Sequence, residues 1–339
     1  GDARYNEPAL AGIMKAVGKA LANLEPVTVS VGRAIDGRVA SNRRFVMRDG
    51  TSECQPGPCN PDILHVEGPM DPEVSVVTFT NAKRRVVSAL MHYTSHPCNG
   101  FWGDKVLADW PGIWSQGMET HFGRQCTALV INGLCGNIIT FNYTDPDQNS
   151  DEVIGDYRRY GRLLTQSAKR ALKNMKPVKA SSFGWTRRFV QIPWRAIPAK
   201  VLADARKMLK EHPEPLWKDP KHIRTEWSWV YNVGILDMVD ERRTQKAFPY
   251  EIQALRIGDF ALLGLMGEPF VEAQLNIKRQ SPFPFLQVAH MCGGACSYVP
   301  TRYALAHGGY ETWIGRGSRL APEALEMIEK ASVQTLKTL

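Results

Sequence analysis

The sequence lacks several of the features that mark common protein classes. No apolar run within its 339 residues approaches the length of a membrane-spanning helix, so we expect no stable membrane insertion. It has no low-complexity tract, no internal repeat and no nucleic-acid-binding module, and its formal net charge of +8 is therefore assigned to a solvated surface. With 43% hydrophobic residues, the composition is that of a globular protein that can bury a substantial core.

Cysteine pairs with the spacing of a structural zinc site are missing as well. None of the seven cysteines forms a CxxC pair. The segments "CQPGPC" and "CGGAC" leave two alternatives open, a small disulfide loop or reduced, partly buried thiols. Cys135 has no base beside it in the sequence, so we expect a buried thiol rather than a nucleophile. The localisation, cytoplasmic or exported, is left undetermined.

The chain opens with "GDARYNEPAL", which is polar and lacks an initiating methionine. A signal peptide would need an apolar core, and none is present in this stretch. We therefore expect a processed or trimmed polypeptide.

Alternating helical and strand patterns predict an α/β protein with a mixed β-sheet flanked by helices. Helices are expected at residues 8–24, 157–175, 199–211 and from 322 onward. Strands are expected at 27–34, on both sides of a turn at 81–84, at 126–132, at 183–194 and in a hairpin turning at 258–259. No domain boundary is apparent, and residues 1–339 are expected to form a single domain.

The stretch at residues 212–231, "HPEPLWKDPKHIRTEWSWVY", is rich in proline and tryptophan. It is too apolar for a linker, and we expect a loop that packs on the domain or lines a pocket. Several tryptophans are candidates for an aromatic-lined pocket, with the protein core as the alternative: Trp102, Trp110, Trp114, Trp217, Trp227 and Trp229.

Three short segments concentrate residues that could form a metal site. In "MHYTSHPCNG", His92 and His96 stand where a strand breaks at a proline, and one of them is expected to be a ligand. In "GLMGEPFVE", Glu268 follows an apolar run, and its carboxylate fits either a zinc ligand or a favourable group at a helix start. In "INGLCGNI", the glycines allow backbone N–H groups to approach a substrate oxygen.

The segment "YVPTRYALAHGGYE" contains three tyrosines and a Gly-Gly pair within a few residues. One interpretation is a turn with aromatic packing. The other is that two of its tyrosines, Tyr298 and Tyr310, belong to an active site, while Tyr303 packs. The glycine pair between them would let the backbone turn so that both phenols face one cleft.

Taken in order, "NRR", "HPCNG" followed by "LADWPG", "NGLCGNI", "GEPFVE" and "YVPTRYALAHGGYE" resemble the neutral/alkaline, non-lysosomal ceramidases and their shorter bacterial relatives. Those proteins are zinc-dependent amide hydrolases. The resemblance runs through most of the chain, and the order and spacing of the motifs are more specific than any one of them. It implies a ceramidase-like catalytic domain.

The resemblance also implies the metal ligands. His96, Glu268 and Tyr298 correspond to zinc ligands of the family, and Asp109 corresponds to an aspartate in the continuation of the histidine motif. His92 is the alternative to His96 as the histidine ligand. The implied cofactor is Zn²⁺.

Residues around the reacting group are implied in the same way. Tyr310 and Arg43 correspond to family residues beside the reacting group, and both could donate to a developing oxyanion. Backbone N–H groups at Gly136 and Asn137 are expected to add further donors. Trp102 is expected to line the substrate pocket.

Two departures from the family pattern bear on mechanism and partners. A second zinc histidine of the family, in a "THTHSGP"-like motif, would precede "YNEPALAGIMKAVGKAL" and is not found in this sequence. Either a second chain cleaved from the same precursor supplies it, or it has been truncated away. Ile139 stands where the family has a serine, which favours attack by zinc-bound water and puts ceramide itself in doubt as the substrate.

The expected function is therefore zinc-dependent hydrolysis of a C–N amide bond in a small or lipid-like molecule. An esterase or lactonase using the same zinc site is one alternative. A metal-free binding subunit is the other.

Overall fold

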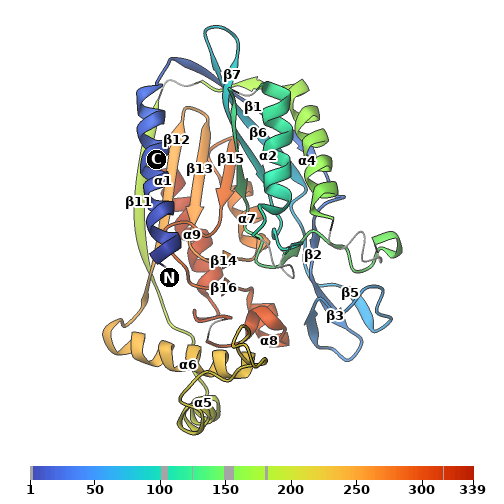
Figure 1. Ribbon diagram of the computed structural model, residues 1–339, viewed down its shortest axis with the longest axis vertical. Helices are drawn as coiled ribbons and strands as arrows, with labels where there is room; N and C mark the ends of the chain where they lie inside the picture. The colour runs from blue at the N-terminus through green and yellow to red at the C-terminus, as the bar shows by residue number, and fades with distance from the viewer. Residues whose placement is uncertain (1–2, 101–105, 124, 149–155, 180–181, 316) are drawn as a thin grey trace.

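Two mixed β-sheets packed face to face form the centre of the protein (Figure 1). The computed structural model describes residues 3–339 except 101–105, 124, 149–155, 180–181 and 316. Helices cover the outer face of each sheet, so the layers follow one another as helix, sheet, sheet and helix. Trp102, predicted to line the substrate pocket, lies outside the described residues.

The first sheet comes mostly from the N-terminal half of the chain. Its strands are antiparallel except for the last pair, and in spatial order they are β10 (Lys176–Pro177), β1 (Val27–Ile35), β6 (Glu73–Asn81), β7 (Val86–Tyr93) and β8 (Thr127–Asn132). On its outer face lie α2 (Asp109–Phe122) and α4 (Tyr157–Ala171), the latter followed by the 3₁₀ turn η2 (Leu172–Asn174).

The second sheet comes from the C-terminal half. Its order is β11 (Phe183–Ile192), β12 (Phe248–Ile257), β13 (Phe260–Leu265) and β15 (Phe285–Ala289), with a parallel pairing only between the last two. Its outer face packs on α7 (Val271–Gln280) and α9 (Ala324–Lys337).

Alternation of side chains along the strands explains why the sheets stack. In β1, Val29 and Val31 point into a cluster shared with Phe260 of β13, whereas Ala34 faces the helices. The central strands β6 and β13 are largely apolar on both faces. Such strands read as nearly continuous hydrophobic runs in the sequence, which is what "VSVVTF" and "FALLGL" are.

Short strand pairs at one end of the sheets tie the functional loops together. They are β14 (Glu268–Pro269) with β16 (Tyr298–Val299), β2 (Ser41–Asn42) with β9 (Ile138–Ile139), and β3 (Arg44–Met47) between β4 (Ser52–Cys54) and β5 (Ile63–Val66). Near them lie α8 (Arg302–His307) and the 3₁₀ turns η1 (Pro146–Gln148) and η3 (Tyr310–Thr312). The β2–β9 pairing joins the most distant of these segments in the sequence, since it places Ser41 opposite Ile139.

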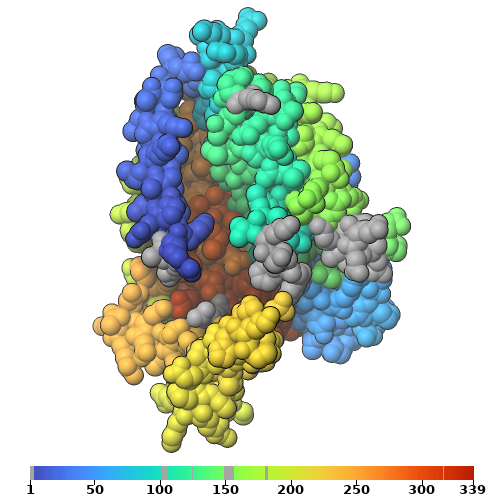
Figure 2. All heavy atoms as spheres, in the orientation of Figure 1, coloured from blue at the N-terminus to red at the C-terminus, as the bar shows by residue number. Residues whose placement is uncertain are grey.

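The N-terminal helix α1 (Ala3–Ala22) lies on the surface with its apolar face uncovered. It begins at residue 3 rather than at the predicted residue 8, with Pro8 inside it. The apolar side chains on its expected inner face are 49–78% exposed: Leu10, Ile13, Met14, Val17, Leu21 and Leu24. Figure 2 shows the helix standing apart, with the surface hollowed between it and α2.

The stretch predicted as a packed loop at residues 212–231 is only partly a loop. α5 (Ala199–Glu211) ends where expected, but α6 (Trp227–Thr244) starts inside the stretch and was not predicted. The aromatic and apolar residues of α6 are spread over all sides of the helix. Its sequence therefore has no amphipathic period that would predict a helix. No helix in the described ranges is long and apolar enough to cross a membrane.

The predicted fold class, α/β with mixed sheets flanked by helices, is confirmed. The strand and hairpin predictions at β1, β6–β7, β8, β11 and β12–β13 agree with the structure. The strands divide into two principal sheets instead of one. Trp110 and Trp114 are fully buried in the core beneath α2, so they do not line a pocket.

The packing of α2 against α4 depends on a glycine. A Cβ at Gly161 would lie 2.5 Å from Cβ of Ile113 and 2.9 Å from the carbonyl oxygen of Trp110. We predict that Gly161→Ala lowers the free energy of unfolding by about 1–3 kcal/mol because the helices must separate. Urea unfolding measures this, with Gly12→Ala as control.

Gly12 lies in α1 with nothing within 4 Å of its added Cβ, so the control keeps the substitution type and removes the clash. Its expected effect is neutral or stabilising by up to about 1 kcal/mol. Equal stability of Gly161→Ala and the wild type would contradict the proposed packing.

Candidate active site

His96 and Glu268 lie in direct contact although 172 positions separate them. The His96 ring places Nε2 at 2.8 Å from the Glu268 Oε2. On the other side of the ring, Nδ1 donates a hydrogen bond of 2.8 Å to the carbonyl oxygen of Ile138. The ring is thereby fixed with one nitrogen on the backbone and the other on a carboxylate.

The loop that carries His96 is closed by Asp109 at the start of α2. One carboxylate oxygen of Asp109 accepts from the Asn99 side chain at 2.9 Å, and the other accepts from the N–H of Gly100 at 3.0 Å. Trp110 donates its indole N–H to the carbonyl oxygen of His96 at 3.3 Å. Asp109 thus shapes the loop, which explains why an aspartate at this spacing accompanies the histidine motif.

Glu268 and Tyr298 are held side by side by the β14–β16 pairing. They are register partners in this parallel pair, and the N–H of Glu268 donates to the carbonyl oxygen of Ser297 at 2.9 Å. The Tyr298 ring lies 6.4 Å from the His96 ring, centroid to centroid. The structure therefore brings the three predicted metal ligands together from three separate segments.

The electrostatics of this cluster favour a shared cation. Burial lowers the pKa of His96, but Cys135 and Glu268 outweigh it and raise the pKa to about 10. Burial raises the pKa of Glu268, and His96 and Arg43 more than offset it, so that pKa is lowered. Because His96 Nδ1–H is committed to a carbonyl, Nε2 and the carboxylate are two lone-pair donors 2.8 Å apart, and only a proton or a metal ion between them satisfies both.

The donor set fits zinc. Zn²⁺ takes imidazole nitrogen and carboxylate oxygen, and a ligating histidine usually donates its other N–H to a backbone carbonyl, as His96 does. Within the described ranges, the His, Cys, Asp and Glu side chains form no group of three that could hold a metal ion. The candidate set reaches three ligands only with the phenol of Tyr298.

Arg43 and Tyr310 flank the Tyr298 ring. The Arg43 guanidinium carbon lies 5.4 Å from the ring centroid, and its Nη2 donates to the carbonyl oxygen of Gly136 at 2.8 Å. The Tyr310 ring meets Tyr298 edge-on at 5.6 Å and is 37% exposed. A buried cation and a half-exposed phenol therefore border the metal-ligand cluster.

Gly136 and Asn137 are engaged within the fold. The N–H of Gly136 donates to the carbonyl oxygen of Pro269 at 3.1 Å. The side chain of Asn137 accepts from the N–H of Val271 at the start of α7 and donates to Glu272, at 2.9 and 3.0 Å. These bonds dock the "GLCGNI" loop onto β14 and α7, and the contact of these two residues with a substrate stays a prediction.

His92 lies outside the cluster. It is fully buried in β7, where its Nε2 donates to the carbonyl oxygen of Val288 in β15 at 3.0 Å. Burial lowers its pKa to about 4, so it is neutral and bridges the two sheets. Of the two histidines in "MHYTSH", only His96 contacts Glu268.

Comparison with known proteins gives a match in structure. No protein-family model and no curated protein matches the sequence. The neutral ceramidase from Pseudomonas aeruginosa superposes with a TM-score of 0.66 at 19% identity, covering 97% of this chain and 55% of that one. A ceramidase complexed with C2 superposes with a TM-score of 0.61 at 17% identity, covering 95% and 55%.

This chain has the neutral-ceramidase fold. It spans about half the length of the two ceramidase structures. The ceramidase-like fold predicted from the ordered motifs is confirmed.

Sequence reasoning missed a partner of Cys135 within this ceramidase-like fold. Its Sγ lies 3.8 Å from both ring nitrogens of His290, which is 155 positions away. Burial raises the pKa of the thiol, but His290 and His96 outweigh it and lower the pKa to about 5. The predicted burial of this thiol is confirmed, and the base that contacts it could not be found from neighbouring sequence because it lies 155 positions away. All seven cysteines are free, so neither "CQPGPC" nor "CGGAC" closes a disulfide.

Gly136 allows a close approach of the loop to Glu268. A Cβ at Gly136 would overlap the carbonyl oxygen of Glu268 and lie 2.9 Å from that of Pro269. We predict that Gly136→Ala displaces the Glu268 backbone and weakens Zn²⁺ binding about 10-fold or more. Titration with Zn²⁺ in competition with a chromophoric chelator measures this affinity.

The matched control is Gly37→Ala, where nothing lies within 4 Å of the added Cβ. Its Zn²⁺ affinity should equal that of the wild type. Wild-type affinity in Gly136→Ala would show that this approach does not support the metal ligands.

Proposed function

We propose that this chain is a zinc-dependent hydrolase that cleaves the C–N amide bond of a small or lipid-like substrate by attack of zinc-bound water. The observation that carries the proposal is the contact of His96 with Glu268 beside Tyr298, with the far side of the imidazole fixed on a backbone carbonyl. The two solved structures that share the fold are ceramidases, which supports an amide as the scissile group.

His96, Glu268 and Tyr298 would hold the metal. A bound Zn²⁺ would lower the pKa of a coordinated water and make hydroxide available near neutral pH. Arg43, fixed over the Tyr298 ring, presents positive charge where the amide oxygen becomes negative, and Tyr310 offers a phenol donor at the same place. Ile139 lies in β9 and offers no hydroxyl, which is consistent with water as the nucleophile.

A row of aromatic rings supports an apolar substrate. The row starts at Tyr298 and continues with centroid distances of 5.6, 5.7, 5.0 and 6.1 Å through Tyr310, Trp313, Tyr231 and Trp227. Two of its members, Trp313 and Trp227, have side chains that are 50% and 56% exposed. Exposed aromatic side chains next to a reacting centre suit an alkyl or other apolar group on the substrate.

We also propose that a histidine from a second chain of the same precursor adds a fourth zinc ligand. With this histidine as a fourth protein ligand, the attacking water would take a fifth coordination position, to which catalytic zinc sites can expand. The uncovered apolar face of α1 supports a partner chain, since large exposed apolar patches mark interaction surfaces. Full activity from this chain alone, as a single band on a denaturing gel, would contradict the second chain.

We predict that His96→Ala and Glu268→Ala each abolish Zn²⁺ binding and amide hydrolysis, because each removes one of the three ligands that this chain would supply. The controls are His121→Ala in the last turn of α2 and Glu326→Ala in the exposed pair with Arg302. Metal content is measured by elemental analysis, folding by circular dichroism. Unchanged turnover in a folded His96 or Glu268 variant would refute the site.

A pair of matched substrates separates the remaining functions. An N-acyl amide with a fluorogenic amine and the ester with the same acyl chain test amidase against esterase activity, and an N-acyl lactone tests the lactonase. We predict turnover of the amide that is lost after chelation and restored by Zn²⁺. Turnover confined to the ester or lactone would favour the alternative hydrolase. A folded protein that binds no Zn²⁺ and turns over none of these would favour the metal-free binding subunit.

A further inference from the structure

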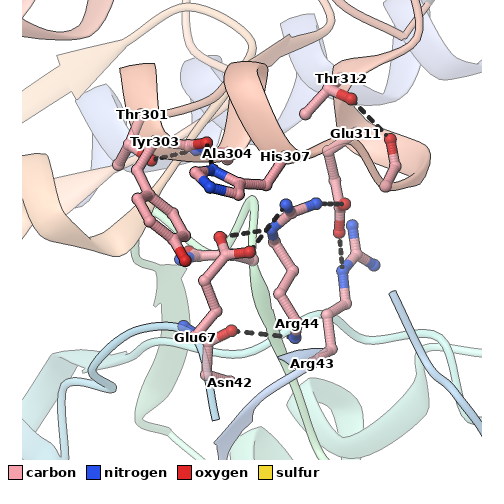
Figure 3. A network of polar contacts seen from close by, with 12 residues as sticks. Asn42, Arg43, Arg44, Glu67, Thr301, Tyr303, Ala304, His307, Glu311 and Thr312 are labelled. Carbon is pink, nitrogen blue, oxygen red and sulfur yellow. Dashed lines mark hydrogen bonds and ion pairs between the residues drawn. The ribbon is translucent and has the colours of Figure 1, made fainter. Parts of the chain in front are cut away.

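Glu311 is a fully buried carboxylate clamped between two arginines (Figure 3). Its Oε1 accepts from Arg43 Nε at 2.8 Å, and its Oε2 accepts from Arg44 Nη1 at 2.7 Å. Each oxygen thus serves a different guanidinium. Cys54 is half-buried beside the same side chains, and burial raises the pKa of its thiol well above its usual value, so the thiol is neutral.

The second arginine is anchored independently of Arg43. Arg44 Nε and Nη2 donate to the two oxygens of Glu67 at 2.7 and 2.9 Å, and Nη2 also donates to the carbonyl oxygen of Gly308 at 2.7 Å. This fork-to-fork geometry is the most rigid that an arginine and a carboxylate form. Arg44 is therefore a fixed support on one side of Glu311.

Arg43 depends on Glu311 more strongly. Apart from its stacking over Tyr298, its guanidinium is held by Nε on Glu311 and by Nη2 on the Gly136 carbonyl. Those two bonds and a side-chain hydrogen bond to Tyr298 use three of its five N–H groups, which leaves two donors for a ligand. Arg43 and Arg44 are also consecutive and both buried, so the carboxylate between them offsets the repulsion of two like charges.

The chain links Glu311 to the site. It directly follows Tyr310 in the 3₁₀ turn η3, and Thr312 donates its hydroxyl back to the carbonyl oxygen of Gly309 at 2.8 Å to close that turn. One short turn therefore positions both the phenol of Tyr310, which borders the site, and the carboxylate of Glu311, which contacts the guanidinium of Arg43.

We propose that Glu311 is the positioning residue for Arg43: it aims the guanidinium at the reacting group without touching the substrate. The Arg44–Glu67 pair supports Glu311 and has no direct role in orienting Arg43. This inference rests on the proposed function in assigning Arg43 to the reacting group, but the placement of Arg43 by Glu311 is testable without turnover.

The turnover-independent test uses the side-chain Nε–H signals of arginine in ¹H–¹⁵N spectra, assigned with Arg43→Lys and Arg44→Lys. In the wild type, both Nε–H groups should exchange slowly because each is bonded to a buried carboxylate. Glu311→Gln should lose the protected Arg43 signal and keep that of Arg44. Glu67→Gln should do the reverse, and it is the matched control because it breaks an ion pair of similar burial.

The kinetic test uses the fluorogenic N-acyl amide. Glu311→Gln should lower kcat about 10²-fold with little change in KM, as expected when a catalytic group is misplaced. Glu67→Gln should stay close to wild type. In the Arg43→Lys background, Glu311→Gln should have almost no further effect on kcat, because it acts through the residue already changed.

The outcomes separate the two proposals. If Glu311→Gln leaves the Arg43 signal protected, or if its kinetic effect adds in full to that of Arg43→Lys, the positioning role is wrong. If the wild type turns over no amide while the two signals respond as stated, the placement holds and the proposed function fails. Should Glu311→Gln unfold, Glu311→Asp keeps the charge but withdraws the carboxylate by one methylene, and the same loss of the Arg43 signal is expected.

Discussion

The contact between His96 and Glu268 is the constraint on which the architecture of the site depends. The histidine follows a strand of the first sheet and the glutamate follows a strand of the second, so the contact forms only if both sheets stack in register. His92 shows how that register is kept, since its neutral ring bridges β7 to β15 four residues before the ligand. A partly buried imidazole and carboxylate at 2.8 Å also need a metal ion or proton between them, which ties the geometry of the sheets to the chemistry of the site.

Behind that contact, the ion network of Arg43, Arg44, Glu67 and Glu311 rigidifies loops that have little regular structure of their own. Burying four charges is expensive, and breaking one such pair costs about 3–5 kcal/mol, so these groups are tolerated only in a fixed arrangement. The network connects the start of β3 to η3 across 268 positions. Through the Arg43–Glu311 pair, Tyr310 and Arg43 are ordered together, at a place where short two-residue strands alone would leave the chain free to move.

Much of this could be predicted from the sequence, and the rest depends on contacts that a sequence does not display. Strands such as β12 and β13 have a strong local period and a clear turn, and the order of short motifs indicated both the fold and the grouping of His96, Glu268 and Tyr298. The pairing of Cys135 with His290 was missed because the base is 155 positions away. Likewise, the amphipathic period of α1 predicts a helix correctly but says nothing about whether its apolar face is covered. The side-chain bonds of Asn137 were missed for the same reason, since their partners in α7 lie 134 and 135 positions away.

The charges around the site explain why these particular residues suit a divalent metal. Glu67, Glu268 and Glu311 face Arg43 and Arg44, so once His96 has released its proton to ligate a metal ion, these side chains carry one net negative charge. That favours uptake of a cation over an empty site. With a divalent ion bound, the same cluster becomes positive by one unit, and the positive charge nearest to a substrate is the guanidinium over Tyr298. The sign of the field thus reverses on metal binding, from one that attracts the metal to one that stabilises a developing oxyanion, and the carboxylate of Glu311 keeps the arginine in place through both states.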